Sequence, residues 1–164
     1  MEESKRQERN KQRLEELYPT FRHRLKRVIS ELEAAGLRPR IQDAWRSPVD
    51  QLKAFKSGHS KLKYGFHNVT GPNGEKQSLA VDMVDDNNPL NSGRAYLLQL
   101  AAAALRQGLH TGIAWGLPKN LSDAIEHAIA AQSWTQNVKI GWDPSHVEPA
   151  GFSVVDAKLG KRPA

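Results

Sequence analysis

Three residues have the side chains of a catalytic zinc site: His67, Asp82 and His146. His67 and Asp82 lie near the two ends of one segment, 65–82, whereas His146 belongs to the sequence Gly-Trp-Asp-Pro-Ser-His-Val-Glu at 141–148. Neutral imidazole nitrogen and carboxylate oxygen are ordinary zinc ligands, and three protein ligands leave a fourth position open for water or substrate. The sequence therefore predicts one Zn²⁺ ion per chain.

A carboxylate beside this set could act as a general base. Asp143 precedes His146 by three residues and could take a proton from a water molecule on the metal, which predicts a hydrolase. The alternative for Asp143 is a turn residue before Pro144. Glu148 is the rival base, although two residues beyond His146 on a strand it would point the same way as the ligand and could instead be its hydrogen-bond partner.

The patterns around these residues resemble those of the zinc peptidases that cut peptidoglycan stem peptides. His67-Asn followed by Leu-Ala-Val-Asp82 is similar to their His-x-x-x-Gly-x-Ala-x-Asp signature, and Asp143-Pro-Ser-His146 to their acid-x-x-His element. Residues 44–51, Ala-Trp-Arg-Ser-Pro-Val-Asp-Gln, resemble their aromatic-Arg-Ser/Thr-x-x-x-Gln segment. The family includes D-alanyl-D-alanine carboxypeptidases, D-alanyl-D-alanine dipeptidases and the L-alanyl-D-glutamate endopeptidases of phage lysins. Two departures stand out: residues 69–77 form an inserted loop, and Ser78 replaces the family glycine.

The resemblance implies roles for further residues. Arg46 would donate paired hydrogen bonds to a developing oxyanion or a substrate carboxylate, and Gln51, Ser60 and Trp142 would contact substrate. The expected substrate is a peptidoglycan stem peptide, cut between L-alanine and D-glutamate or, alternatively, trimmed of terminal D-alanine. The resemblance also implies an α+β fold in which helices cover one face of a small, mainly antiparallel sheet and the zinc site lies on the other.

Periodicity predicts the elements that must position this site. Apolar residues recur at three- and four-residue steps from Leu14 to Leu32, which predicts helix, with Pro19 in a first turn or at a kink and Gly36 as terminator. Ser47 and Ser92 are candidate helix caps. Further helices are predicted over 48–57, 93–107 and 121–132. Strands are predicted over 38–45, 79–84, 138–142 and from 147 onward. These helices and strands do not alternate regularly, which independently favours α+β.

The chain is expected to comprise a charged helix or tail (1–18), one peptidase domain (19–158) and a disordered tail (159–164). With 164 residues, 38% hydrophobic and 26% charged, it has the composition of an ordinary soluble protein. No apolar run is long enough to span a membrane. The absence of cysteine excludes disulfides and thiolate zinc ligands. We expect a monomer.

Charge and the amino terminus constrain partners and location. The net charge of +6 favours polyanionic partners, but the basic residues are scattered among acids, so nucleic acid is not expected as a partner. The first ten residues lack the apolar stretch of a signal peptide. A protein made in the cytoplasm in this way would act on the cell wall only after release. A binding module that does not cleave wall peptide is the alternative of another class.

Overall fold

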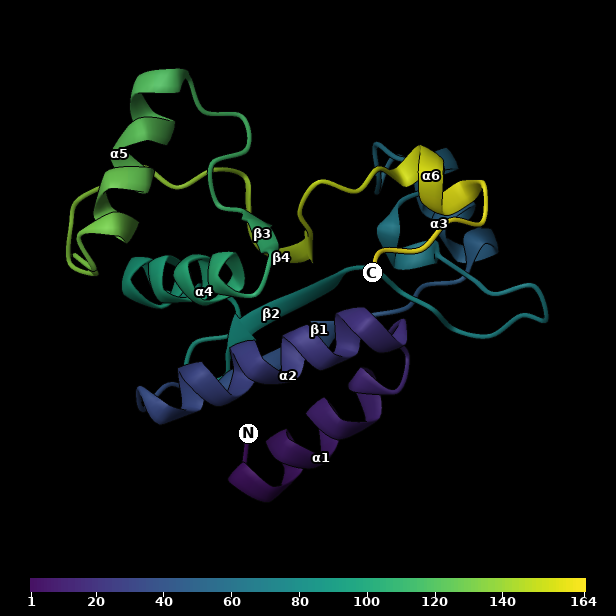
Figure 1. The fold of residues 1–164 in the computed structure, drawn as a ribbon, viewed down its shortest axis with the longest axis horizontal. Helices are drawn as coiled ribbons and strands as arrows, with labels where there is room; N and C mark the ends of the chain where they lie inside the picture. Colours follow the sequence, from purple (N-terminus) through teal and green to yellow (C-terminus); the bar gives the residue numbers. More distant parts are fainter.

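A four-stranded antiparallel sheet forms the centre of the molecule, in a computed structural model that describes residues 1–164 (Figure 1). Its strands are β1 (Pro39–Asp43), β2 (Val81–Asp85), β3 (Leu109–Gly112) and β4 (Asp143–Pro149), in the order β1-β2-β4-β3. Side chains alternate between the two faces of a strand. Val81 and Met83 are fully buried, so Asp82 between them points to the opposite face of the sheet.

Helices α2 (Pro19–Ala34) and α4 (Arg94–Arg106) build the core against one face of the sheet, and the remaining helices lie around it. These are α1 (Glu3–Leu14), α3 (Pro48–Lys56), the 3₁₀ turn η1 (Phe66–Asn68), α5 (Lys119–Ala130) and α6 (Val154–Lys158). Pro19 begins α2, where its missing N–H costs nothing. The apolar stripe of α2 from Phe21 to Leu32 packs with α4 into one buried cluster beneath the strands. None of the helices is long and apolar enough to cross a membrane. The α+β fold with an antiparallel sheet is thus confirmed.

Helix α1 covers the outer edge of β1 with polar side chains. The Asn10 side-chain amide donates to the Pro39 carbonyl (2.9 Å) and accepts from the Ile41 N–H (2.8 Å), as a neighbouring strand would. Arg9 donates to the Ile41 and Gln42 carbonyls at 3.0 and 2.9 Å. The charged segment that the sequence assigns to a solvated helix or tail is therefore a helix with a buried, polar contact face.

Several predicted boundaries are confirmed and others are wrong. Ser47 caps α3 by accepting from the Asp50 N–H at 3.0 Å. Ser92 does not cap α4, because its hydroxyl accepts from the Asp85 N–H. Residues 138–142 form no strand: Gly141 and Trp142 donate to carbonyls of the 113–115 turn, and the strand begins only at Asp143. The short strand β3 and helix α6 were not predicted.

The insertion at 69–77 bulges outward as a small hairpin. Thr70 and Lys76 pair across it, and Gly74 occupies a turn position with φ +83°. Ser78, at the site of the family glycine, is fully buried, and its backbone pairs with the α1–α2 connection through Glu16 and Tyr18. The insertion therefore leaves His67 and Asp82 in register.

The last residues of the chain lie against the hairpin, although the sequence favours a disordered tail. Arg162 donates to the Gln77 side chain (2.9 Å) and to the Thr70 carbonyl (3.1 Å). Thr20 of α2 donates to the Pro163 carbonyl at 3.0 Å. These contacts join the carboxyl-terminal segment to α2 and the insertion.

Candidate metal site and cleft

The three predicted ligands converge on the face of the sheet that is not covered by α2 and α4. Asp82 on β2 and His146 on β4 are directly opposite partners in the antiparallel register, and η1 brings His67 beside them. His67 Nε2 lies 3.6 Å from Asp82 Oδ2, and His146 Nδ1 lies 3.5 Å from Asp82 Oδ1. The three ligand atoms all lie within 4.8 Å of one another.

This spacing fits zinc. Ligand atoms at about 2.1 Å around a tetrahedral Zn²⁺ ion lie roughly 3.4 Å apart, close to both distances to Asp82. The histidine rings meet edge to face, with centroids 5.2 Å apart at 72°, so neither ring blocks the space between them. The donor types and separations of these residues are therefore compatible with a metal ion such as zinc.

Hydrogen bonds fix which nitrogen of each histidine faces the site. His67 Nδ1 lies 2.6 Å from the Ala44 carbonyl, so this nitrogen donates and Nε2 presents its lone pair. His146 Nε2 lies 2.8 Å from Glu148 Oε1, which leaves Nδ1 toward Asp82. Ligating histidines generally donate their second N–H to a carbonyl or carboxylate in this way. Glu148 is thus a partner of the ligand, as its spacing on the strand suggested.

Without a metal, the site is a network of coupled charges. Burial opposes ionisation of Asp82, but its hydrogen bond with His146 and the charge of His67 lower its pKa overall. Burial likewise disfavours the charged form of His146, yet Asp82 and Glu148 outweigh it and raise the pKa of His146 to about 9. For Glu148, burial favours the neutral form, but the neighbouring His110 and His146 overcome it and lower the pKa to about 2.

Asp143 lies at the entrance of the same group. Its Oδ2 is 3.8 Å from His146 Nδ1. Burial and the neighbouring charge of Asp82 raise the pKa of Asp143. A carboxylate with a raised pKa beside a metal site, but outside the ligand set, has the chemistry of a general acid–base group.

Residue His110 belongs to this network, although no local motif in the sequence contains it. It lies on β3 opposite Glu148, and its Nε2 is 3.3 Å from Glu148 Oε2. The contact is not an aligned hydrogen bond. The position of His110 depends on the pairing of β3 with β4, so sequence reasoning, which did not predict β3, missed it.

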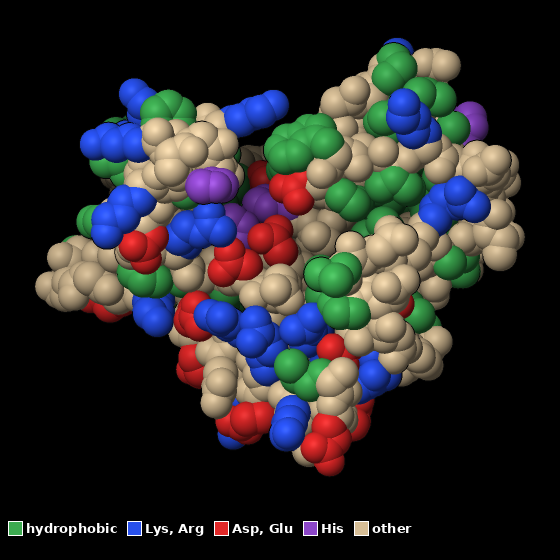
Figure 2. Space-filling model, turned by 180° about the vertical axis from the view of Figure 1, so that it is seen from behind, with side chains coloured by type: hydrophobic (Ala, Val, Ile, Leu, Met, Phe, Trp, Pro, Cys, Tyr) green, Lys and Arg blue, Asp and Glu red, His purple; other side chains and the backbone are tan.

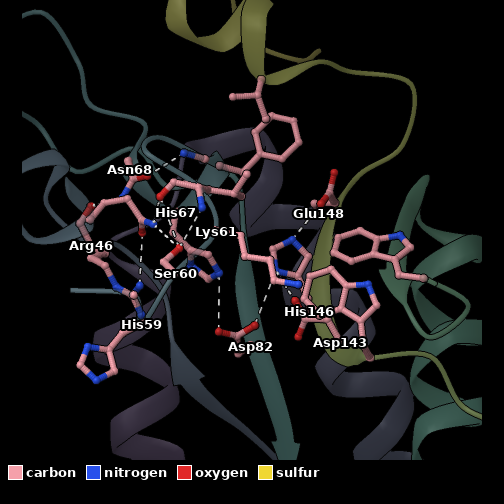
Figure 3. A pocket seen from close by; sticks show the side chains of 18 residues that line it. Arg46, His59, Ser60, Lys61, His67, Asn68, Asp82, Asp143, His146 and Glu148 are labelled. Carbon is pink, nitrogen blue, oxygen red and sulfur yellow. Dashed lines mark hydrogen bonds and ion pairs between the residues drawn. The ribbon is translucent and has the colours of Figure 1, made fainter. Parts of the chain in front are cut away.

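The site forms the floor of a cleft of about 510 Å³. Figure 2 shows histidine and acidic side chains in a hollow, with basic and hydrophobic side chains around its rim. Arg46, His59, Ser60 and Lys61 line the cleft on the side of His67 (Figure 3). Trp115 and Trp142 also line it, and the Trp115 ring packs beside that of His146. The cleft is thus cationic on the side of His67 and aromatic beside His146.

The predicted substrate-contacting residues all line this cleft, in different ways. Arg46 donates to Asp43 Oδ2 (2.9 Å) and Gln51 Oε1 (3.2 Å), and its side chain is partly exposed. Gln51 is buried, and its amide donates to Ser60 Oγ (2.8 Å) and the Leu62 carbonyl (2.7 Å). Trp142 is 71% exposed. Gln51 and Ser60 thus contact each other, whereas Trp142 is open to solvent.

Two glycines that sequence reasoning missed allow the aromatic wall to pack closely. A Cβ on Gly112 would lie 2.2 Å from the Asp143 carbonyl oxygen and 2.8 Å from the Trp115 ring. A Cβ on Gly141 would lie 2.6 Å from the Trp115 backbone. The Trp115 ring in turn lies 5.1 Å from that of His146 and 5.6 Å from that of Trp142. Only the structure shows this need for glycine, because the contacts are long-range.

Comparison with known proteins finds a match at the level of structure alone. No known protein family and no curated protein matches the sequence. Among solved structures, the chain is similar to the crystal structure of the Serratia marcescens L-Ala D-Glu endopeptidase ChiX, with a TM-score of 0.50 and 18% sequence identity. The likeness covers 87% of this chain and 86% of that chain. The two proteins therefore share a fold over most of their lengths.

Proposed function

We propose that this protein is a zinc-dependent peptidase that hydrolyses the bond between L-alanine and D-glutamate in peptidoglycan stem peptides. The observation that carries the proposal is the preorganised ligand set: His67, Asp82 and His146 at metal-binding separation, with the ring nitrogens fixed by Ala44 and Glu148. The set lies in an open cleft on the fold of the Serratia endopeptidase. The sequence motifs of the zinc peptidases fall on the same residues, which supports assignment to that family.

The zinc ion would polarise the scissile carbonyl and lower the pKa of a bound water molecule. Asp143 would accept a proton from the attacking water at its carboxylate and then deliver it to the departing amine nitrogen. Its raised pKa makes the Asp143 carboxylate a stronger base toward the water. The departing amine is far more basic than any carboxylate, so the protonated Asp143 can still deliver the proton to it. Glu148, bonded to His146 Nε2, is engaged in holding the ligand and is not the base in this proposal.

Arg46 would stabilise negative charge on the substrate. Its guanidinium is held by Asp43 and Gln51, yet part of it remains accessible in the cleft. A planar guanidinium offers two parallel donors to a carboxylate or an oxyanion, which a lysine cannot do. Gln51 would act by fixing Arg46 rather than by contacting substrate, because its own amide is engaged with the 60–62 backbone and hydroxyl.

Digestion of purified peptidoglycan tests the reaction. The zinc-loaded protein should create new amino termini on D-glutamate, identified by mass spectrometry, and a chelator should abolish them. Release of free D-alanine alone would instead establish a carboxypeptidase. A protein that binds peptidoglycan but releases no peptide or amino acid from it would be a wall-binding module.

Metal content tests the site independently of substrate. His67→Ala and His146→Ala should each lose the one zinc ion per chain that the wild type retains after dialysis, since removal of one of three ligands breaks the set. His127→Ala is the matched control, because His127 lies exposed on α5 outside the cleft. Unchanged zinc in both ligand variants would overturn the assignment.

A further inference from the structure

The cationic wall of the cleft contains one lysine, Lys61, that forms no ion pair with an acidic side chain. The segment 57–64, Ser-Gly-His-Ser-Lys-Leu-Lys-Tyr, contains no acidic residue. His59 and Lys61 line the cleft, and neither forms an ion pair, whereas Arg46 beside them is paired with Asp43. Figure 3 shows Lys61 over the cleft, between the side of His67 and that of His146. This wall therefore presents unpaired positive charge next to the proposed metal.

Gln51 of α3 holds the residues on both sides of Lys61 in place. Gln51 contacts both Ser60 Oγ and the Leu62 carbonyl, and the Leu62 N–H donates back to Ser60 Oγ at 3.2 Å. The same Gln51 accepts from Arg46. Lys61 is flanked by these two anchored residues, so its backbone is fixed relative to Arg46 while its side chain stays free. Such an arrangement positions a cation without neutralising it.

The proposed substrate has an anionic group that would lie close to this wall. In stem peptides D-glutamate continues the chain through its γ-carboxyl group, so its α-carboxylate is free. That carboxylate is attached to the same carbon as the nitrogen released by the cut, and it must therefore lie in the cleft whenever the scissile bond reaches the metal. An anion there gains from any nearby unpaired cation, because the cleft excludes part of the screening water.

We propose that Lys61 forms an ion pair with the free α-carboxylate of the D-glutamate residue, with His59 as its neighbour at the cleft rim. This inference rests on the proposed function and names the group that sets its specificity. Amidation of that carboxylate removes the charge with little change in shape. The protein should therefore prefer D-glutamate to its α-amide, and the preference should depend on Lys61.

A two-by-two comparison of substrates and variants tests the proposal. The kcat/KM of the zinc-loaded protein is measured on a synthetic stem peptide with the free α-carboxylate and on its α-amide, for wild type and Lys61→Gln. A partly exposed ion pair is worth roughly a three- to tenfold effect. Wild type should favour the acid by that factor, and Lys61→Gln should lose it through slower cleavage of the acid alone.

Two further variants make the result specific. Lys61→Arg should keep the preference, because it keeps the charge. Lys63→Gln should also keep it, because Lys63 lies over the Phe55 ring (5.3 Å) and not in the cleft. Equal cleavage of acid and amide by wild type, or an equal loss on both in Lys61→Gln, would refute the role of Lys61. Cleavage of neither peptide by zinc-loaded wild type would refute the proposed function itself.

Discussion

Zinc and a proton should compete for His146, and the competition predicts an unusual pH dependence of zinc affinity. In the metal-free protein, Asp82 and Glu148 overcome the effect of burial and raise the pKa of His146 to about 9, from 6.5 for an ordinary histidine. Zinc binds only the deprotonated nitrogen. Well below pH 9 each lost pH unit should weaken binding about tenfold. Because His146 is already half protonated at pH 9, affinity should be about 50-fold lower at pH 7 than at pH 9, or about 2 kcal/mol. A histidine of pKa 6.5 would contribute almost nothing over this range.

The assay is a competition titration with a zinc chelator of known pH dependence, at pH 7, 8 and 9. Glu148→Gln is the control, because it removes the carboxylate that accepts from His146 Nε2 at 2.8 Å. Its affinity should fall roughly 10- to 100-fold at pH 9, and its dependence on pH should become shallower as the pKa of His146 falls. Deprotonation of zinc-bound water contributes to both proteins. Equal slopes in wild type and Glu148→Gln would refute this account of the His146 charge.

Further predictions concern the proposed base, the two walls and a tight backbone contact. Asp143→Asn should retain zinc but lose roughly 100-fold or more in kcat, measured with metal content on the same sample; near-normal turnover would transfer the role to Glu148. Arg46→Lys should lower kcat/KM about tenfold or more without changing Tm, because the two-donor fork is lost; equal kinetics would contradict an oxyanion role. Trp142→Ala should raise KM with unchanged zinc content, since this 71% exposed ring packs only at the cleft rim; an unchanged KM would place substrate elsewhere. Gly112→Ala should destabilise folding by about 1–3 kcal/mol in urea unfolding, because its Cβ would lie 2.2 Å from the Asp143 carbonyl oxygen; unaltered stability would show that β3 shifts freely.

The proposed metal-binding residues could be predicted because each belongs to a short local pattern. His67, Asp82, Asp143 and His146 lie in two segments whose motifs need no knowledge of the rest of the fold, and the structure brings them together. Helices α2 to α5 could likewise be predicted from local signals, which are apolar periodicity, cap residues and composition within or next to each helix. These motifs and helices are determined by residues that are close together in the sequence, so the sequence alone is enough to predict them.

Features that depend on distant partners could not be predicted. β3 has only four residues and follows directly after the α4 terminator Gly108, so its pairing with β4, and the place of His110 beside Glu148, depend on tertiary contacts. Residues 138–142 have strand-like composition, but a register shift between Thr111 and Gly112 leaves them bonded to an irregular turn. Ser78 stands where the resembled motif has glycine, and its buried hydroxyl donates to the Ala80 carbonyl at 2.8 Å, a contact that local sequence does not reveal.

The polar contact face of α1 has a consequence for self-association. An uncovered edge strand offers free N–H and C=O groups to any other extended chain, and proteins avoid polymerisation by occupying or charging such edges. Here the side chains of Arg9 and Asn10 occupy that edge at β1, at the opposite side of the sheet from β3. Helix α1 thus blocks the addition of another strand at the β1 edge. Although α1 contains none of the proposed catalytic residues, it would set the protein concentration above which sheets of different molecules pair through this edge.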